Sequence, residues 1–380
     1  MNICINCVKD SHLKDFIRKE NIIGHCTLCG LSGYVSDTEE KKFFQLVKAL
    51  LRFHYSEWDY NEHWGGDGYE SLFYREDNIF FDVTRSISEE AYEEVVLSIV
   101  DGPVYEDYDK GVSIYAGYDA DGQQNMLLQS ISSDLDVSIL KITERLKTEN
   151  HFALEKEVKE LVQKYIDVAR MKIQCGEVIY RARVGFEKKK ICYSNGFVPE
   201  FHFEPYKGTK IGAPPPYLAA NGRANRAGVS FLYCATDEYT ALSEVRPHPG
   251  DLVSIGTFRV NKDIFVYDLS GSKLIHFFES DRLLDSYKVF NTLGEMMNKT
   301  IAPSERMHYS ITQLITDCIR LVGFDGVVFN STVGSGKNIV LFDHNCTEQL
   351  QDKASIVLVD SVKYKYSKEK VVTDDECYLD

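Results

Sequence analysis

The sequence contains no apolar run near the ~18 residues that a membrane-spanning helix requires, which argues against an integral membrane protein. Its first residues, Met-Asn-Ile-Cys-Ile-Asn-Cys, lack the basic and apolar regions of a secretory signal, so we expect a cytoplasmic location. A basic excess is also absent. The formal net charge of −15 argues against a broad nucleic-acid-binding surface, which needs a basic stripe. With these classes of protein disfavoured, we expect a globular protein, and its 380 residues are enough for two or three domains.

The spacing of the cysteines is the distinctive feature of the N-terminal region. Cys4-x-x-Cys7 and Cys26-x-x-Cys29 are two pairs at the spacing of tetrathiolate zinc sites. Each CxxC places two thiolates on one tight turn, and two such turns complete a tetrahedron. We therefore predict a structural Zn²⁺ held by four thiolates, with a disulfide pair or an incidental repeat as the alternatives. Because all four ligands are Cys, no coordination position stays open for catalysis.

The chain divides into three predicted regions. Residues 1–35 form the Cys4 zinc module, 36–172 form a mostly helical regulatory domain, and 173–380 form the catalytic domain. In the helical region, Ser36-Asp-Thr-Glu39 has the pattern of a capping box that opens a helix. Further helices are expected near the ranges 89–100, 134–147 and 151–171 from the spacing of their apolar residues.

After residue 175 the pattern changes to short runs rich in β-branched and aromatic residues. Strands are expected over 178–183, 229–233, 252–259, 264–267, 327–329, 339–342 and 355–364, and an amphipathic helix over 308–322 closed by Gly323. This half is therefore α+β. The run Lys188-Lys189-Lys190 is the densest basic segment and is interpreted as a solvated loop or turn, and the acidic tail 373–380 as a frayed end.

The most informative stretch runs from Asn221 to Glu244. A Gly-Arg loop containing Arg223 leads into an apolar strand that ends near Tyr233, and a helix opened by Thr236 or Asp237 carries Glu244. A loop arginine can bind phosphate through two hydrogen bonds, a tyrosine can stack on a flat ring, and a glutamate can stabilise developing positive charge. These three requirements coincide in a dinucleotide whose ribosyl bond is about to break.

The stretch resembles the RES family. The motifs that carry the resemblance are Gly222-Arg-Ala-Asn-Arg-Ala-Gly228, Tyr233-Cys-Ala235, Ala241-Leu-Ser-Glu-Val245 and, downstream, Gly323-Phe-Asp-Gly-Val-Val-Phe-Asn-Ser-Thr-Val-Gly-Ser-Gly-Lys-Asn338, in which the family serine falls on Ser331. They occur in the family's order over about residues 175–365. The sequence departs from the family at Ala224, where many members carry Trp.

The resemblance implies an ADP-ribosyltransferase-like split β-sheet domain that cleaves NAD⁺ at the nicotinamide–ribose bond. The catalytic residues would be Arg223, Tyr233, Glu244 and Ser331. Substrate contacts would also come from Arg181 and Asn338. Arg181 and Arg183 alternate along one strand, so only one of them can face the cleft. The resemblance also implies a toxin or phage-defence effector, with the acceptor left open among inorganic phosphate, water and a protein. The N-terminal regions would restrain the enzyme or sense a trigger, and the possible partners are an antitoxin or a trigger protein. The sequence is compatible with a homo-oligomer but leaves the oligomeric state of the protein open.

The alternative is an RNA-binding or RNase module. A zinc ribbon followed by a HEPN-like bundle can act on RNA, and Arg145-x5-His151 has the spacing of the HEPN Arg–His motif. The segment Gly334-Ser-Gly-Lys337 resembles a phosphate loop, but the Walker pattern needs glycine where Ser331 stands and Ser or Thr where Asn338 stands. An ATPase is therefore not favoured.

Overall fold

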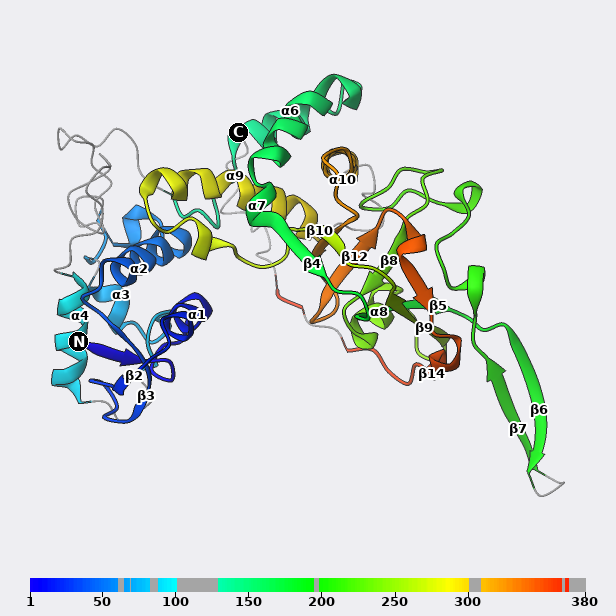
Figure 1. The fold of residues 1–380 in the computed structure, drawn as a ribbon, viewed down its shortest axis with the longest axis horizontal. Coiled ribbons are helices and arrows are strands. Elements are labelled where there is room, and N and C mark those ends of the chain that lie inside the picture. Colours follow the sequence, from blue (N-terminus) through cyan, green and yellow to red (C-terminus); the bar gives the residue numbers. More distant parts are fainter. Residues whose placement is uncertain are drawn as a thin grey trace, which may run out of the picture. The chain divides into compact units, whose positions relative to one another are not determined.

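The computed structural model describes residues 1–60, 65–68, 70–82, 88–100, 129–194, 198–300, 309–363 and 366–368 (Figure 1). The chain forms two compact units that alternate along the sequence. Unit 1 consists of Met1–Met171, Asn221–Arg226 and Val266–Asn330, and unit 2 of Lys172–Ala220, Ala227–Phe265 and Ser331–Asp380. The chain therefore passes from one unit to the other five times. The predicted functional division at 35 and 172 stays a prediction.

Unit 1 begins with a small antiparallel sheet in which β3 lies between β1 and β2. Its helix α1 starts at Asp10, whose carboxylate accepts hydrogen bonds from the backbone N–H groups of His12 and Leu13, and ends at Asn21 in the left-handed conformation. The bounds of this part are β1 Asn2–Cys4, α1 Ser11–Glu20, β2 Ile22–His25 and β3 Ser32–Asp37.

The remainder of unit 1 is mostly helical. Helices α6 and α10 pack against each other, and α9 packs on strand β11, which runs parallel to β10. Its further elements are α2 Lys41–His54, α3 Ser71–Tyr74, α4 Glu89–Val100, α5 Val137–Arg145, α6 His151–Lys164, α7 Ile166–Ala169, α9 Asp281–Asn298, α10 Tyr309–Leu321 and β11 Gly326–Asn330. Two strands, β4 Arg170–Ile173 and β10 Ile264–Asp268, run across the points where the chain changes unit.

An ion cluster is buried where α2 meets the start of α9. The Asp281 carboxylate accepts hydrogen bonds from Lys48 Nζ at 3.1 Å and Arg52 Nη1 at 2.8 Å. The three side chains are 1–7% exposed. Burial lowers the pKa of Lys48, although the nearby Asp281 charge opposes that shift. Two buried cations therefore share the Asp281 carboxylate, Arg52 also pairs with the partly exposed Asp285 at 3.2 Å, and each buried partner is costly to remove alone.

Unit 2 is built on antiparallel strands in the order β13-β9-β5-β8-β12, with β14 also paired to β9. The short helix α8 packs on β5, β8 and β9 through a cluster that contains Ala182, Ala235 and Ala241, whose small side chains allow a close approach. The bounds are β5 Val178–Val184, β8 Leu232–Ala235, α8 Glu238–Glu244, β9 Leu252–Val260, β12 Lys337–Leu341, β13 Thr347–Gln349 and β14 Ser355–Leu358.

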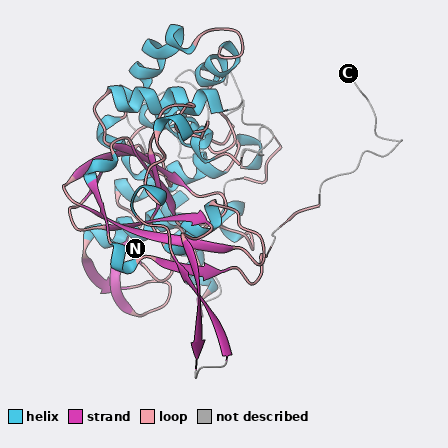
Figure 2. Cartoon of the chain, turned by 90° about the vertical axis from the view of Figure 1, so that its right-hand side faces the viewer, coloured by secondary structure: helices cyan, strands magenta, loops and turns pink. Residues whose placement is uncertain are grey.

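A separate hairpin also belongs to unit 2. Strands β6 (Lys188–Ser194) and β7 (Val198–Glu204) pair antiparallel with each other as a two-stranded sheet. In both views the ribbon extends away from the other strands of its unit (Figures 1 and 2).

The α+β expectation is confirmed, and four local expectations are corrected. Ser36 and Asp37 end β3, where Ser36 pairs with Ile3, so no capping box forms and α2 begins at Lys41. The strand expected over 229–233 is displaced to Leu232–Ala235. The lysine run lies in strand β6 and not in a loop. The strand from Ser355 ends at Leu358, and the acidic tail lies outside the described residues.

Candidate functional site

The Glu244 carboxylate is fixed by two side chains from elsewhere in unit 2. Its Oε1 accepts a hydrogen bond from the Ser331 hydroxyl at 2.7 Å and another from Asn338 Nδ2 at 2.7 Å. Glu244 is the last residue of α8, Ser331 follows β11, and Asn338 lies in β12. No hydrogen bond to Oε2 is found within the part of the chain that the structure describes. The site therefore holds one carboxylate oxygen and leaves the other to a ligand.

The Ser331 hydroxyl uses its one donor and both of its acceptor positions within the protein. It donates its single proton to Glu244 and accepts from the backbone N–H groups of Val333 at 3.2 Å and Gly334 at 2.8 Å. The Ser331 N–H donates to the carbonyl of Gly336. The loop 331–336 is therefore folded around this one side chain, which orients it toward Glu244.

Two glycines let this loop lie directly on the first turn of α8. A Cβ at Gly336 would come within 2.0 Å of Asp237 Oδ2, and a Cβ at Gly334 within 2.7 Å of Thr240 Oγ1. The buried Thr240 hydroxyl accepts from the Gly336 N–H at 2.9 Å and donates to Asp237 at 2.8 Å. The sequence pattern indicated Thr236 or Asp237 as the start of the helix, but not the contact of Asp237 and Thr240 with this loop. The usable signal was the glycine pair after Ser331, which suits an unusually close backbone approach.

Burial alone would raise the pKa of Asp237, but hydrogen bonds outweigh it. The carboxylate caps α8 by accepting from the backbone N–H of Thr240 at 2.7 Å, and it also accepts from the hydroxyls of Thr240 and Thr236. The net effect lowers the pKa of Asp237, so the cap is ionised at neutral pH.

Arg181 is a half-buried cation of the same unit. It lies on β5, and its Nη1 donates to the backbone carbonyl of Tyr233 on β8 at 2.7 Å. Its Nε is buried without a hydrogen-bond partner, and burial lowers the pKa of the guanidinium. Among the described residues no carboxylate lies within 4 Å of it. Arg183 differs: it lies over the Tyr206 ring and donates to the carbonyl of Lys210. The two arginines therefore differ in burial: Arg181 has a buried Nε without a hydrogen-bond partner, whereas Arg183 is exposed.

Arg223 belongs to unit 1, and its described contacts lie there. Its guanidinium donates to the Met297 carbonyl and lies 5.8 Å from the centroid of the Phe329 ring, while its own carbonyl accepts from the Thr312 hydroxyl. The structure thus brings Glu244, Ser331 and Asn338 together and joins Arg181 to the backbone of Tyr233. It places Arg223 on the loop that begins at Asn221, as the motif predicted.

Comparison with known proteins matched one family over part of the chain. Residues 197–367 match the family described as RES domain. This part of the chain is therefore similar to a RES domain. The matched range contains Arg223, Tyr233, Glu244, Ser331 and Asn338, whereas Arg181 and strand β6 precede it. A comparison with curated proteins found no match.

Among solved structures, a chain of the M. tuberculosis MbcT-MbcA toxin-antitoxin complex is similar. It is 13% identical, with 52% of this chain and 91% of that chain covered and a TM-score of 0.28. At that TM-score the likeness supports no argument about this chain.

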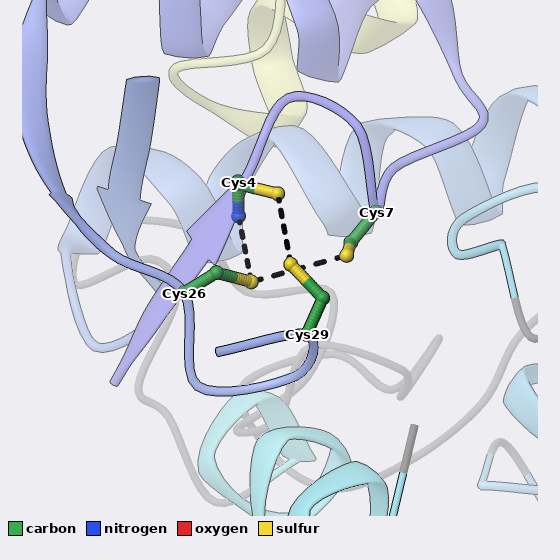
Figure 3. A group of neighbouring side chains, drawn as sticks. All are labelled: Cys4, Cys7, Cys26 and Cys29. Carbon is green, nitrogen blue, oxygen red and sulfur yellow. Dashed lines mark hydrogen bonds between the residues drawn. The ribbon is translucent and has the colours of Figure 1, made fainter. Parts of the chain in front are cut away.

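Outside the RES domain, four cysteines converge in unit 1. Figure 3 shows the sulfurs of Cys4, Cys7, Cys26 and Cys29 pointing toward one another. All four Sγ atoms lie within 4.8 Å of one another, with Cys4–Cys29 at 3.7 Å and Cys7–Cys26 at 3.9 Å. A tetrahedral site with Zn–S bonds of about 2.3 Å requires S–S separations of about 3.8 Å. The cluster therefore fits a zinc ion.

The backbone around the cysteines supports the same interpretation. The Cys7 N–H donates to the Cys4 carbonyl, and the N–H of Gly30, at φ 69°, donates to the Cys26 carbonyl, which gives each pair a tight turn. Hydrogen bonding from Cys7 and from nearby backbone amides lowers the pKa of Cys26 to about 4. The same hydrogen bond, together with burial, raises the pKa of Cys7.

The Arg145–His151 pair is not brought together by the described contacts. Arg145 ends α5 and donates to Glu149 and Glu157, at 2.9 Å to each. His151 begins α6, and its Nε2 is buried without a hydrogen bond. Burial and the nearby Arg226 charge lower the pKa of His151. No described residue contact therefore favours the RNase alternative.

None of the described helices is long and apolar enough to cross a bilayer.

Proposed function

We propose that the RES domain cleaves NAD⁺ at the bond between nicotinamide and ribose. Breaking this bond develops positive charge on the ribose, as in glycoside hydrolysis, and nicotinamide departs as a neutral molecule with the bonding electron pair. The observation that carries the proposal is the Glu244 carboxylate, held through Oε1 by Ser331 and Asn338 at 2.7 Å each. Its Oε2 would accept ribose hydroxyls and stabilise the developing cation.

Ser331 and Asn338 would act on the substrate through Glu244. The hydroxyl proton of Ser331 and an amide proton of Asn338 both go to Oε1, so these residues fix the orientation of the carboxylate. Because an oriented group need not reorganise during reaction, such positioning lowers the barrier. Direct contact of Ser331 with phosphate or the carboxamide would require its hydroxyl to leave Glu244.

The arginines would hold the anionic part of the substrate. Arg181 has a buried Nε without a partner and no carboxylate within 4 Å among the described residues, which suits a phosphate oxygen. Arg223 would contribute a second guanidinium, and Tyr233 would stack on the nicotinamide ring. The ADP-ribosyltransferase-like arrangement of the domain belongs to the same proposal.

The acceptor would be inorganic phosphate, which gives ADP-ribose-1″-phosphate, or water. In either case an acceptor oxygen bonds to the anomeric carbon as the nicotinamide bond breaks, and the acceptor loses a proton. Loss of cellular NAD⁺ would make the protein a toxin or phage-defence effector, which an antitoxin would restrain or a trigger protein would activate.

An NAD⁺ consumption assay with and without phosphate, on the natural protein and on Glu244→Gln, tests the proposal. We expect consumption by the natural protein and a loss of at least about 10²-fold in the variant, because a neutral amide cannot stabilise the cation. Dependence on phosphate would assign phosphorolysis, and independence would assign hydrolysis. Equal consumption by both proteins would refute the role of Glu244.

We also propose that Cys4, Cys7, Cys26 and Cys29 hold a structural Zn²⁺. Mass spectrometry of the metal content should find one zinc per chain in the natural protein and a strongly reduced content in Cys26→Ser. Cys175→Ser is the matched control, because Cys175 is exposed and lies in unit 2. A full zinc content in Cys26→Ser would contradict the assignment.

A further inference from the structure

The β6–β7 hairpin presents an uncovered apolar face. Residues paired directly across two strands lie on the same face, and side chains alternate between faces along each strand. The pairs Ile191–Phe201 and Lys189–Phe203 therefore share a face with Tyr193. The contact of Lys189 Nζ with the Phe201 ring, at 3.7 Å from its centroid, agrees with this assignment.

This face is exposed to a degree that is unusual for large apolar side chains. Ile191 is 57% exposed, Tyr193 64% and Phe201 53%. Toward the base of the hairpin the face is partly covered by Phe186, whose ring centroid lies 4.9 Å from that of Phe203. A contiguous exposed apolar patch of this kind marks an interaction surface. The hairpin needs such support, since an isolated two-stranded ribbon is marginally stable in water.

The charge of β6 indicates the character of what binds there. Lys188, Lys189 and Lys190 follow one another along the strand, and all are exposed. In the part of the chain that the structure describes, none of them forms an ion pair with a carboxylate. The hairpin's own carboxylates on the face that holds Lys188 and Lys190 are Glu200 and Glu204, which lie on β7, with Glu204 opposite Lys188. The positive edge is therefore that of β6, and on a chain of net charge −15 it is complementary to an acidic partner.

The dimensions of the face argue against a second copy of this chain. Two strands of seven residues offer a face of about 23 Å by about 10 Å, so stacking two copies would bury about 460 Å² in total. Specific stable interfaces bury about 1,200 Å² or more. A partner that also pairs with the open edge of β6 gains main-chain hydrogen bonds in addition to apolar contacts.

We propose that the β6 edge and the apolar face of the hairpin bind an extended segment of a partner protein in which acidic and apolar residues alternate. A strand added beside β6 continues both faces of the ribbon. Its apolar residues would lie beside Ile191 and Tyr193, and its acidic residues beside Lys188 and Lys190 on the opposite face. The hairpin would thereby become the centre of a three-stranded sheet.

The test uses the full chain and a synthetic peptide that alternates glutamate and valine over the length of β6. We expect fluorescence anisotropy to show at least about 10-fold tighter binding than for the same peptide with lysine in place of glutamate. Phe201→Glu should weaken binding at least about 10-fold. Tyr217→Glu is the matched control, because Tyr217 is 84% exposed but lies outside the hairpin, and it should bind as the natural protein does.

The double variant Lys188→Glu/Lys190→Glu keeps the test decisive if Phe201→Glu disturbs the fold. It alters exposed residues on the polar face and should reverse the preference, so that the lysine peptide binds more tightly. Equal affinity for the two peptides in the natural protein would overturn the proposal. So would a concentration-dependent dimer, detected by light scattering, that disappears in Phe201→Glu, since that result would assign the face to a second copy.

Discussion

At the scale of single residues, Glu244 and Asp281 illustrate two uses of a carboxylate. Both accept two side-chain hydrogen bonds. Neutral donors hold Glu244, so its charge stays available to a ligand, whereas the cations Lys48 and Arg52 neutralise Asp281. The first arrangement suits chemistry and the second suits structure.

Asp281→Asn should therefore be strongly destabilising. The substitution preserves the shape of the side chain but removes the buried charge that faces Lys48 and Arg52, while Arg52 keeps a second carboxylate, the partly exposed Asp285; we expect a loss of about 3–5 kcal/mol. Urea unfolding followed by circular dichroism measures the change. Asp15→Asn is the control, because Asp15 and Arg18 form an exposed pair, 61% and 59% accessible, whose loss should cost at most about 1 kcal/mol. Similar losses in both variants would contradict the assigned role of burial.

At the scale of elements, the joint between α8 and the loop 331–336 determines the geometry of the site. Gly336→Ala would force a Cβ against Asp237 and Thr236 and move the loop away from the helix. We expect a stability loss of about 1–3 kcal/mol, and a fall in NAD⁺ cleavage of up to about 10²-fold because Ser331 would be displaced from Glu244.

Thermal unfolding and steady-state kinetics together measure this effect. Gly33→Ala is a suitable control, since nothing lies within 4 Å of a Cβ at that position and φ is ordinary. If Gly336→Ala retained full activity, the close contact of loop and helix would have no role in positioning Ser331.

The sequence singled out residues that the structure brings together, but it did not indicate the neighbours that position them. Local patterns identified α4 over Glu89–Val100 and the end of α10 at Gly323, because amphipathic spacing and a left-handed glycine are local signals. The motifs likewise identified Glu244 and Ser331, which the structure joins. The hydrogen bonds of Thr240 to the glycine loop depend on residues 96 positions apart, and no local pattern encodes them.

Two misinterpretations have the same origin. Ser36 has the local pattern of a helix cap, but pairing with Ile3 places it in the central strand of a sheet. The run Lys188–Lys190 has the composition of a solvated loop, but pairing with β7 makes it a strand that remains exposed. In both cases strand pairing outside the local window overrode the local preference.

At the scale of the whole molecule, the interleaving of the two units predicts the result of truncation. Residues 266–330 belong to unit 1, so a fragment that starts at residue 173 carries α9 and α10 without the α2 and α6 surfaces that cover them. We expect this fragment to be insoluble or aggregated when expressed alone, as sedimentation and size-exclusion chromatography would show. A soluble, folded fragment would contradict this prediction. Restraint by the N-terminal regions is therefore better tested with point substitutions in the full chain.

The order of the site residues along the chain has a consequence during synthesis on the ribosome. Glu244 is made early, whereas Asn338, one of the two residues that hold it, comes 94 positions later. At about 5–20 residues per second, translation needs about 5–19 s to cover that interval. Throughout it the nascent chain has the acidic residue but not the groups that orient it. Under the proposed function, a nascent chain that has not reached Asn338 would lack the oriented carboxylate, so restraint would be needed only after that residue has been made.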